Sequence, residues 1–352
     1  MDKNTALIAM SGGVDSTVAA WLTLQEGFTC MGATMTLFDS GCGAGAVADA
    51  RAAAEKLQIP FRVYGLENDF SHEVIDDFVT CYESGLTPNP CIRCNRALKF
   101  GRLLELATEA GCHHIVTGHY AQVLQDPETG RYLLCKGLDE GKDQSYFLYA
   151  LTQEQISRIR FPLGTLSKDQ VRAIAEAQGF TNAKKKDSQD ICFIPDGDYG
   201  AFLRRYTGKY YPQGDFLDQN GKKVGTHNGA VNYTLGQRKG LGLAMGAPVY
   251  VCGKDMAANT VTVGPNEALF SQELVAGDWF FFPFDRLTEP LEVTAKVRSR
   301  MEAQPATVYP LENGLCRVVF QEPQRAITPG QAVVLYDGDV VVGGGTILRN
   351  KC

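Results

Sequence analysis

Apolar and polar residues alternate in two different ways along this chain. In the first half, short apolar runs typical of buried strands alternate with stretches whose apolar residues recur at helical spacing. The expected strands are Ala6–Met10, Thr29–Met35, Phe61–Gly65 and His114–Gly118, and the expected helices lie near 17–26, 46–57, 69–84 and 95–110. This alternation predicts an α/β domain, in which helices cover both faces of a parallel sheet.

The pattern changes near residue 210. Glycine and proline become frequent there, and short runs of alternating polarity follow one another, among them PVYVCG, NTVTVG, LEVTAKVRS and CRVVF. Such runs predict two small β-rich modules with a boundary near Pro265. We therefore divide the chain into residues 1–205, 206–265 and 266–352, and we expect the last part to be a β-barrel.

Composition places the chain among globular proteins. Its 352 residues are 44% hydrophobic, which is enough for more than one core. No apolar run approaches the roughly 20 residues of a membrane-spanning helix, and the N-terminus lacks the features of a secretory signal. We expect a cytoplasmic protein without a membrane partner. The eleven cysteines then favour redox, nucleophilic or metal-binding roles over a disulfide framework.

The net charge of −6 hides an uneven distribution. Residues 181–245 carry ten Lys/Arg and six Asp/Glu, a local charge of +4, so that the rest of the chain carries −10. A basic segment of this kind can bind a phosphate backbone, although each of its side chains could equally belong to a solvated face. The candidate contacts are Lys184 to Lys186, Arg204, Arg205, Lys209, Arg238, Lys239, Arg298 and Arg300.

The segment AMSGGVDS, residues 9–16, joins the first expected strand to the first expected helix. Paired glycines let the backbone turn tightly and aim amide groups at an anion on the positive end of a helix. Ser11, Ser16 and Thr17 can add hydroxyl donors, and Asp15 can help to place a metal ion that bridges phosphates. The alternative is an ordinary turn in which Ser16 or Thr17 is the N-cap.

The string S-G-G-x-D-S differs from both the Walker pattern and the dinucleotide fingerprint. It resembles the pyrophosphate loop of the ATP pyrophosphatases, which cleave ATP between its α and β phosphates to adenylate an oxygen atom. This resemblance implies ATP as the ligand and leaves the acceptor open.

A second segment, TPNPCIRCNRALKF at residues 87–100, predicts an ordered loop that leads into a helix starting near Asn95. Cys91 and Cys94 have C-x-x-C spacing near this helix start, and Arg96 and Lys99 follow them. Positive potential there would favour thiolates. Half of a zinc or iron–sulfur site is the alternative, although such a site usually needs a second cysteine pair and the other cysteines are scattered singly.

A third segment, KKKDSQDICFIPDGDYGAFL at residues 184–203, places Cys192 in an apolar run after a triple lysine. Taken alone, Cys192 is either a small buried hydrophobe on a strand or a functional thiol. The lysines either bind phosphate or form a solvated face.

Seven segments together resemble one family, the tRNA-specific 2-thiouridylases, which install sulfur at C2 of the wobble uridine of tRNA. They are AMSGGVDS, TPNPCIRCNRALKF, TGHY (117–120), GKDQSYFLY (141–149), KKKDSQDICFIP, YTLGQRKGLGL (233–243) and ITPGQAVVLYDGD (327–339). The resemblance covers nearly the whole chain. It implies an adenine nucleotide α-hydrolase-like domain that uses ATP with Mg²⁺ to adenylate the C2 oxygen, releases pyrophosphate, and then transfers sulfur from a cysteine persulfide.

The resemblance also assigns roles to residues. It implies that Cys94 is the nucleophile, that Cys192 carries the persulfide, and that the two form a transient disulfide. The implied ATP-binding residues are Ala9, Met10, Ser11, Gly12, Gly13, Val14, Asp15, Ser16, Met35 and Gly118. Asn89, Pro90 and Cys91 are expected near the target base, and His119, Lys142, Asp143, Gln144, Arg300, Met301 and Gln331 are expected to contact tRNA. Cys91 departs from the family, whose members commonly carry Asp at this position.

The implied partners are tRNA, a persulfide donor and a reductant for the disulfide, and neither a structural metal nor a prosthetic group is expected. Three alternatives stay open. The first is another enzyme of the same loop class, such as an amidotransferase synthetase or argininosuccinate synthetase, which would need neither Cys94 nor Cys192. The second is an iron–sulfur-dependent tRNA thiolase. The third is a tRNA-binding or redox-sensing protein in which Cys91 marks the loss of catalysis.

Overall fold

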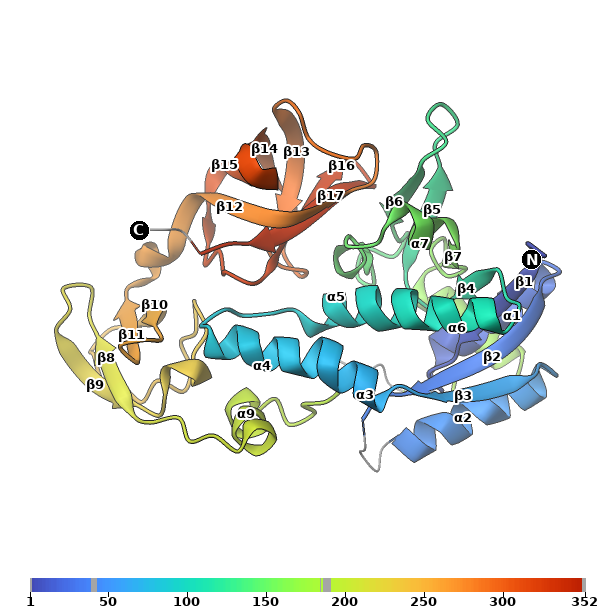
Figure 1. The fold of residues 1–352 in the computed structure, drawn as a ribbon, viewed down its shortest axis with the longest axis horizontal. Helices are drawn as coiled ribbons and strands as arrows, with labels where there is room; N and C mark the ends of the chain where they lie inside the picture. The colour runs from blue at the N-terminus through green and yellow to red at the C-terminus, as the bar shows by residue number, and fades with distance from the viewer. Residues whose placement is uncertain (1, 39–42, 184, 186–190, 350–352) are drawn as a thin grey trace.

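A five-stranded parallel sheet forms the N-terminal part of the molecule (Figure 1). The computed structural model describes residues 2–38, 43–183, 185 and 191–349, and all structural statements concern these residues. The strand order is β3-β2-β1-β4-β7, with bounds β1 Thr5–Ala9, β2 Thr29–Thr36, β3 Phe61–Gly65, β4 His114–Val116 and β7 Ile159–Arg160. The predicted parallel sheet is thus confirmed, and each expected strand is present.

Helices cover both faces of this sheet, as predicted. Ala6 and Ile8 of β1 point to one face, where they pack with α1 (Val14–Gln25), α2 (Gly43–Lys56) and α8 (Lys168–Ala177). Leu7 points to the other face and packs against residues 92–107. Successive side chains of a strand alternate between faces, and both faces are buried here, which explains why β1 is an uninterrupted apolar run.

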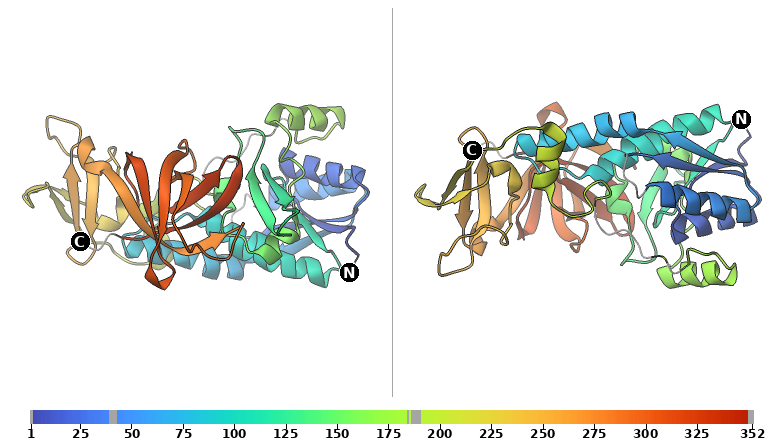
Figure 2. Two further views of the ribbon diagram at one scale, coloured as in Figure 1. Left: turned by 90° about the horizontal axis from the view of Figure 1, so that it is seen from above. Right: turned by 90° about the horizontal axis from the view of Figure 1, so that it is seen from below.

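Two long helices lie side by side beneath the barrel (Figures 1 and 2). One consists of α3 (Glu67–Phe70), a π-helical turn at Ser71–Ile75, and α4 (Asp76–Glu83). The other consists of α5 (Pro90–Cys94), a π-helical segment at Asn95–Arg102, and α6 (Leu103–Glu109). The prediction that this helix begins near Asn95 is wrong. It begins at Pro90, because proline at the first helical position has a suitable φ and needs no partner for an N–H group.

The C-terminal part is a closed barrel, which confirms the expectation. Six strands follow one another around it in the order β12-β15-β14-β13-β16-β17, and pairing of β12 with β17 closes the ring. Their bounds are β12 Phe270–Phe281, β13 Leu291–Lys296, β14 Gln304–Pro310, β15 Cys316–Arg325, β16 Ala332–Asp337 and β17 Val340–Ile347.

A smaller β-sheet is formed by the residues between the N-terminal part and the barrel in the sequence, and it lies at the end of the molecule away from the N-terminus (Figure 1). Its strands have the order β10-β11-β8-β9, with bounds β8 Gly214–Leu217, β9 Lys223–His227, β10 Tyr250–Asp255 and β11 Thr260–Gly264. Helix α9 (Tyr199–Thr207) precedes it, and β11 ends six residues before β12 begins. None of the helices within the described ranges is both long and apolar enough to cross a membrane.

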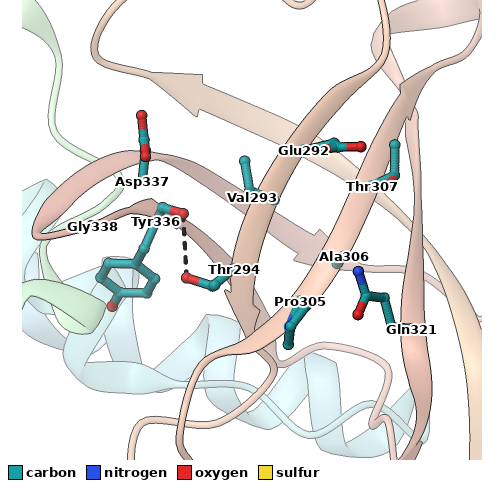
Figure 3. A pocket seen from close by; sticks show the side chains of 10 residues that line it. All are labelled: Glu292, Val293, Thr294, Pro305, Ala306, Thr307, Gln321, Tyr336, Asp337 and Gly338. Atoms are coloured by element: carbon teal, nitrogen blue, oxygen red, sulfur yellow. Dashed lines mark hydrogen bonds between the residues drawn. The ribbon is translucent and has the colours of Figure 1, made fainter.

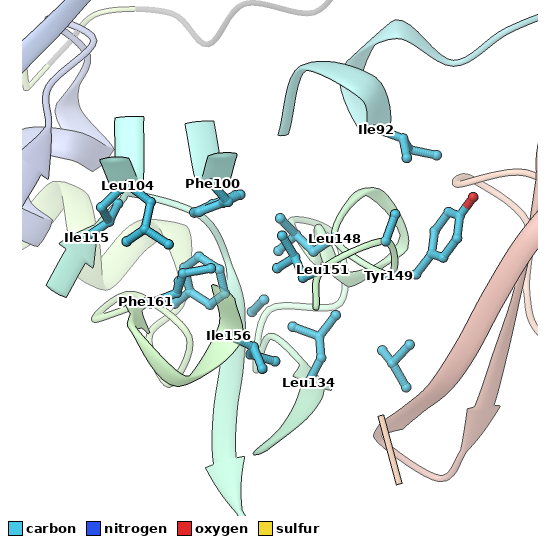
Figure 4. Close-up of a cluster of buried hydrophobic side chains, with 14 of the residues drawn as sticks. Ile92, Phe100, Leu104, Ile115, Leu134, Leu148, Tyr149, Leu151, Ile156 and Phe161 are labelled. Carbon is cyan, nitrogen blue, oxygen red and sulfur yellow. The ribbon is translucent and has the colours of Figure 1, made fainter. Parts of the chain in front are cut away.

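A hairpin inserted into the N-terminal part joins it to the barrel. Strands β5 (Ala121–Gln125) and β6 (Tyr132–Lys136) form this hairpin, and β6 pairs with the start of β17. Helix α7 (Gln153–Ser157) lies against β6. Leu134 of the hairpin belongs to one buried cluster with residues of the long α5–α6 helix and with Val334 and Val341 of the barrel (Figure 4). The two parts therefore share a core, which the sequence did not predict.

Candidate nucleotide loop and cysteine centre

The segment AMSGGVDS forms the turn from β1 into α1, at the carboxyl edge of the sheet. This position lies where the strand order reverses, between β1 and β4, which is the usual ligand site of such sheets. Gly13 is the N-cap of α1 and has no side chain with which to cap the helix. The alternative with Ser16 or Thr17 as the N-cap is therefore wrong. Both hydroxyls instead donate to the Gly13 carbonyl, at 3.1 Å each.

Two glycines of this site are required by close packing. Gly12 has a φ of +71°, and an added Cβ would lie 2.5 Å from the Ala46 carbonyl oxygen of α2. A Cβ on Gly118, which follows β4, would lie 2.7 Å from the Asp15 carbonyl carbon and 2.8 Å from the Ser16 nitrogen. Gly118 thus packs directly against the start of α1, where the sequence places the ATP phosphates.

The backbone of the loop is held from two further sides. Thr34 of β2 donates its hydroxyl to the Met10 carbonyl at 2.6 Å, and the Met10 amide donates to Ala33 at 2.8 Å. Met35, at the end of β2, is half-buried on the same edge of the sheet. Lys185 donates to the Asp49 carboxylate at 2.7 Å and to the Gly12 carbonyl at 3.3 Å. Of the three lysines 184–186, it is the one that the structure describes.

The Asp15 side chain is engaged by protein donors. Lys168 Nζ lies 2.7 and 2.8 Å from its two carboxylate oxygens, and the Tyr120 hydroxyl donates to Oδ1 at 2.9 Å. The sequence suggested instead that Asp15 helps to place a metal ion. In this structure its carboxylate is already bonded to Lys168, which lies outside every motif, and to Tyr120, the last residue of TGHY, to which no role had been assigned.

Cys94 and Cys192 come from distant segments but belong to one neighbourhood. Cys94 ends α5 and packs in the same buried cluster as Phe193, which directly follows Cys192. The Phe193 ring lies 5.6 Å from that of Phe70 and 5.4 Å from that of Phe78, both in the α3–α4 helix. These aromatic contacts hold the turn at 191–194 beside α5, although 98 residues separate the two cysteines in the sequence.

The two cysteines differ in exposure. Cys94 is 9% exposed, whereas Cys192 is an exposed residue of a turn in which the Ile194 amide bonds the Ile191 carbonyl. The alternative that Cys192 is a buried hydrophobe on a strand is therefore wrong. Cys91 is also exposed, and all three are free thiols.

Desolvation by the surrounding protein atoms, not positive potential, dominates the chemistry of these thiols. It raises the pKa of Cys94 and of Cys91 above the ordinary range and raises the pKa of Cys192 to about 11, although Cys91 and Cys192 both keep surface that solvent can reach. Lys99 lowers each pKa, but by less, and Cys94 and Cys91 add to the rise at Cys192. The expectation that this helix start favours thiolates is thus wrong in the structure, because desolvation outweighs the attraction of Lys99 at both Cys91 and Cys94.

Two residues next to these cysteines, Arg93 and Asn95, hold α5 and the segment after it against neighbouring elements. Arg93 donates to the Glu73 carbonyl at 3.0 Å and to the Glu73 carboxylate at 2.6 Å, so that it links α5 to the π-helical turn of the neighbouring helix. Asn95 is buried and donates its side-chain amide to the Phe147 carbonyl at 3.0 Å. Both lie in the segment 87–100, but only the fold shows what they bind.

The barrel contacts the loop that precedes Cys91. Gln331 donates its side-chain amide to the carbonyls of Thr87 and Pro88, at 2.8 and 3.2 Å. The Thr87 amide donates in turn to Pro329 at 2.9 Å. Gln331, which we expected at the tRNA, therefore also holds the barrel against the loop that leads to Asn89 and Pro90.

The other expected tRNA contacts have partners within the protein or lie on its surface. His119 bonds Thr117 at 2.7 Å, and burial lowers its pKa far below the ordinary value, so the imidazole is neutral. Asp143 accepts from the Gly137 and Ser145 amides, and Gln144 accepts from the Tyr120 amide. Lys142 precedes them in the same turn. Arg300 is exposed on the barrel, whereas Met301 turns inward and accepts from the Val297 amide.

The remaining basic candidates lie on the surface. Arg204, Arg205, Lys209, Arg238, Lys239 and Arg298 are all exposed. Lys209 pairs with Glu83 at 2.8 Å, and Arg298 bonds the Arg325 carbonyl. Lys184 and Lys186 lie outside the described residues.

The described residues offer no cluster of metal ligands at this site. Within the described ranges, no three His, Cys, Asp or Glu side chains are grouped so that they could hold a metal ion, so Cys91 and Cys94 lack the further ligands of a zinc or iron–sulfur site there. A pocket on the barrel wall is lined by residues of β13, β14 and β16, with Thr294 bonded to the Tyr336 carbonyl (Figure 3). It includes none of the predicted site residues.

Comparison with known proteins identifies similar chains. Family models match residues 4–196 (tRNA methyl transferase HUP domain), 200–265 (tRNA methyl transferase PRC-barrel domain) and 271–347 (aminomethyltransferase beta-barrel domain). The chain is 47% identical to the tRNA-specific 2-thiouridylase MnmA of Acetivibrio thermocellus, over 99% of this chain and 100% of that one. It is 45% identical to the tRNA-specific 2-thiouridylase MnmA of Clostridioides difficile, over 98% of each. Among solved structures, a U34-tRNA thiolase of Methanococcus maripaludis with its [4Fe-4S] cluster is 18% identical, with a TM-score of 0.38 over 58% of this chain and 68% of that one.

Proposed function

We propose, since this chain belongs to the tRNA-specific 2-thiouridylase family, that it uses ATP to replace the C2 oxygen of the wobble uridine of tRNA with sulfur. The observation that carries this proposal is the pairing of two sites in one domain. One is a phosphate loop at the carboxyl edge of a parallel sheet, and the other is a buried cysteine beside an exposed one. The descriptions of the matching family models name methyl transfer, a reaction that requires neither site.

The loop is suited to the first step. The C2 oxygen of a pyrimidine is a poor leaving group, so it must first attack the α-phosphate of ATP and displace pyrophosphate. The free amide groups in the first turn of α1 and the positive end of that helix stabilise the charge that builds up on the phosphates. The magnesium ion enters as part of the MgATP substrate.

The two cysteines are suited to the second step. Cys192 is exposed and can accept a persulfide sulfur from a donor protein, whereas Cys94 is shielded from solvent. In one route the outer sulfur of the Cys192 persulfide attacks C2, and Cys94 then attacks the Cys192 sulfur and releases the 2-thiouridine. In the other route Cys94 attacks the Cys192 sulfur first and releases hydrosulfide, which then attacks C2. AMP leaves C2 in either case, the Cys94–Cys192 disulfide forms, and an external reductant must restore both thiols.

In this proposal the basic surface residues and the barrel bind the tRNA. In this proposal residues 1–205 carry both reaction steps, while residues 206–265 and 266–352 bind the tRNA. Because the target base is stacked in the anticodon loop, it must be turned out into a protein pocket. The segment Asn89–Arg93 forms one wall of that pocket, directly after Thr87 and Pro88, which the barrel residue Gln331 bonds.

Nucleoside mass spectrometry tests this function. Purified protein, ATP, a persulfide donor and unmodified tRNA should yield 2-thiouridine, one AMP per modified base, and no product when ATP is omitted. Formation of methylated uridine, or ATP cleavage that needs no tRNA and survives alkylation of Cys94 and Cys192, would reject the proposal. Thiolation that requires an iron–sulfur cluster, with visible absorbance in anaerobic protein, would favour the cluster-dependent alternative instead.

A further inference from the structure

Helix α8 supplies a buried amino group to the nucleotide loop. Lys168 is the first residue of α8, and its side chain is only 8% exposed. Its Nζ bridges both carboxylate oxygens of Asp15, whose side chain is 28% exposed in the first turn of α1. A lysine that is so little exposed is uncommon unless it is paired. The pair therefore fixes the position of Asp15.

Tyr120, which follows strand β4, also bonds the Asp15 carboxylate. Its side chain is 2% exposed, and its hydroxyl donates to Asp15 Oδ1 at 2.9 Å. Gly118, two residues earlier, lets this segment approach the Asp15–Ser16 peptide closely. The first turn of α1 is thus bonded through Asp15 to Lys168 of α8 and to Tyr120, which follows β4.

Both partners of Asp15 are themselves tied to one segment. The Lys168 backbone amide donates to Asp139 Oδ2 at 2.9 Å. Tyr120 exchanges two bonds with Gln144, through its amide to the side-chain oxygen at 3.0 Å and through its carbonyl to the Gln144 amide at 2.9 Å. The support of the loop therefore runs through residues 139–144, and the bonds from Lys168 to Asp139 and from Tyr120 to the Gln144 side chain are partly buried.

We propose that Lys168 and Tyr120 are positioning residues that hold the Asp15 carboxylate at the mouth of the nucleotide loop and thereby set its affinity for MgATP. The inference rests on the proposed function, since it assumes that the loop binds ATP. Loss of either partner would leave the other as an unpaired charge at a partly buried site, and the first turn of α1 would no longer be held in the position that the triphosphate needs.

A thermodynamic double-mutant cycle tests whether the two residues act through Asp15. Binding of Mg²⁺ with a non-cleavable ATP analogue is measured by calorimetry for the parent, Lys168→Met, Asp15→Asn and the double variant. Each single variant should bind the analogue about tenfold more weakly, and the double variant should match the single variants within about threefold, because residues that act as one unit are not additive. Lys223→Met breaks an exposed pair with Asp215 in the small sheet and should bind like the parent.

Two results would overturn the inference. Additive losses in the double variant would mean that Lys168 contacts the nucleotide by itself, and unchanged binding in either single variant would remove the role of the pair. Should Lys168→Met not fold, the same cycle with Tyr120→Phe decides, because this change removes only the hydroxyl; it should cost about threefold and be lost in the Asp15→Asn background. A parent protein that does not bind the analogue would refute the proposed function and not this inference alone.

Discussion

Replacing Gly118 by alanine tests how closely the nucleotide loop depends on its packing. The added Cβ would lie 2.7 Å from the Asp15 carbonyl carbon, whereas ordinary contacts begin at 3.4 Å. The first turn of α1 must therefore move by 0.7 Å, the difference between these two distances, or the two segments must absorb the overlap as strain. The two nearest atoms, the Asp15 carbonyl carbon and the Ser16 nitrogen, belong to the backbone, so the overlap cannot be relieved by rotation of a side chain.

The size of the effect follows from this displacement. Overpacking of a well-filled site typically costs about 1–3 kcal/mol, and a misplacement of about 1 Å at a reacting group can reduce a rate by about a hundredfold. We expect tRNA-dependent release of pyrophosphate to fall by between about tenfold and a hundredfold. The affinity for tRNA should stay near the parental value, since the contacts of the barrel and of the basic surface are untouched.

The assay follows pyrophosphate release at saturating tRNA over a range of ATP concentrations. Gly45→Ala is the matched control, because this exposed glycine of α2 has open space around its Cβ position, and alanine is the better helix former. A Gly118→Ala enzyme that keeps the parental KM for ATP and the parental rate would refute the packing argument.

Further predictions concern the cysteine centre. Cys94→Ser and Cys192→Ser should each abolish 2-thiouridine formation without loss of ATP or tRNA binding, as measured by nucleoside mass spectrometry and filter binding; thiolation at the parental rate in either would contradict the roles given to them. Cys91→Asp should keep most of the activity, because the family commonly carries Asp there, and a complete loss would assign Cys91 a chemical role. Alkylation of Cys94 should accelerate about tenfold per pH unit up to at least pH 9, since its pKa is raised, and a plateau below pH 8 on peptide mass spectrometry would refute that. Arg93→Met should slow sulfur transfer with little effect on pyrophosphate release, because it frees α5 from the π-helical turn at Glu73; equal loss in both assays would show a general effect on folding.

The features that the sequence predicted are those with local causes. The central strand β1 is an apolar run buried on both faces, and the turn after it depends on Gly12, whose φ of +71° favours glycine. The N-terminal sheet, the closed barrel and the place of the nucleotide loop could be predicted for this reason.

The features that it did not predict arise from contacts between distant segments. Lys168 is 153 residues from Asp15, and Gln331 is 244 residues from Thr87. The thiol pKa values depend on what covers α5, and a C-x-x-C spacing cannot reveal that. The π-helical segments and the start of the helix at Pro90 likewise depend on packing and on one proline, not on the period of apolar residues.

The raised thiol pKa values fit a reaction with an ordered sequence of steps. At neutral pH Cys94 is protonated, because burial outweighs the attraction of Lys99, and a protonated thiol does not attack a disulfide or persulfide sulfur. In the proposed reaction, a persulfide on exposed Cys192 would therefore not be consumed by Cys94 while the site is empty. Loss of the Cys94 proton must await a change in its surroundings, and one source of such a change is the segment Asn89–Cys91 at the start of α5, which follows the residues Thr87 and Pro88 that the barrel holds through Gln331. Because the target base is expected at this loop, we expect binding of tRNA to control when Cys94 becomes reactive, so that sulfur is released only when an acceptor is in place.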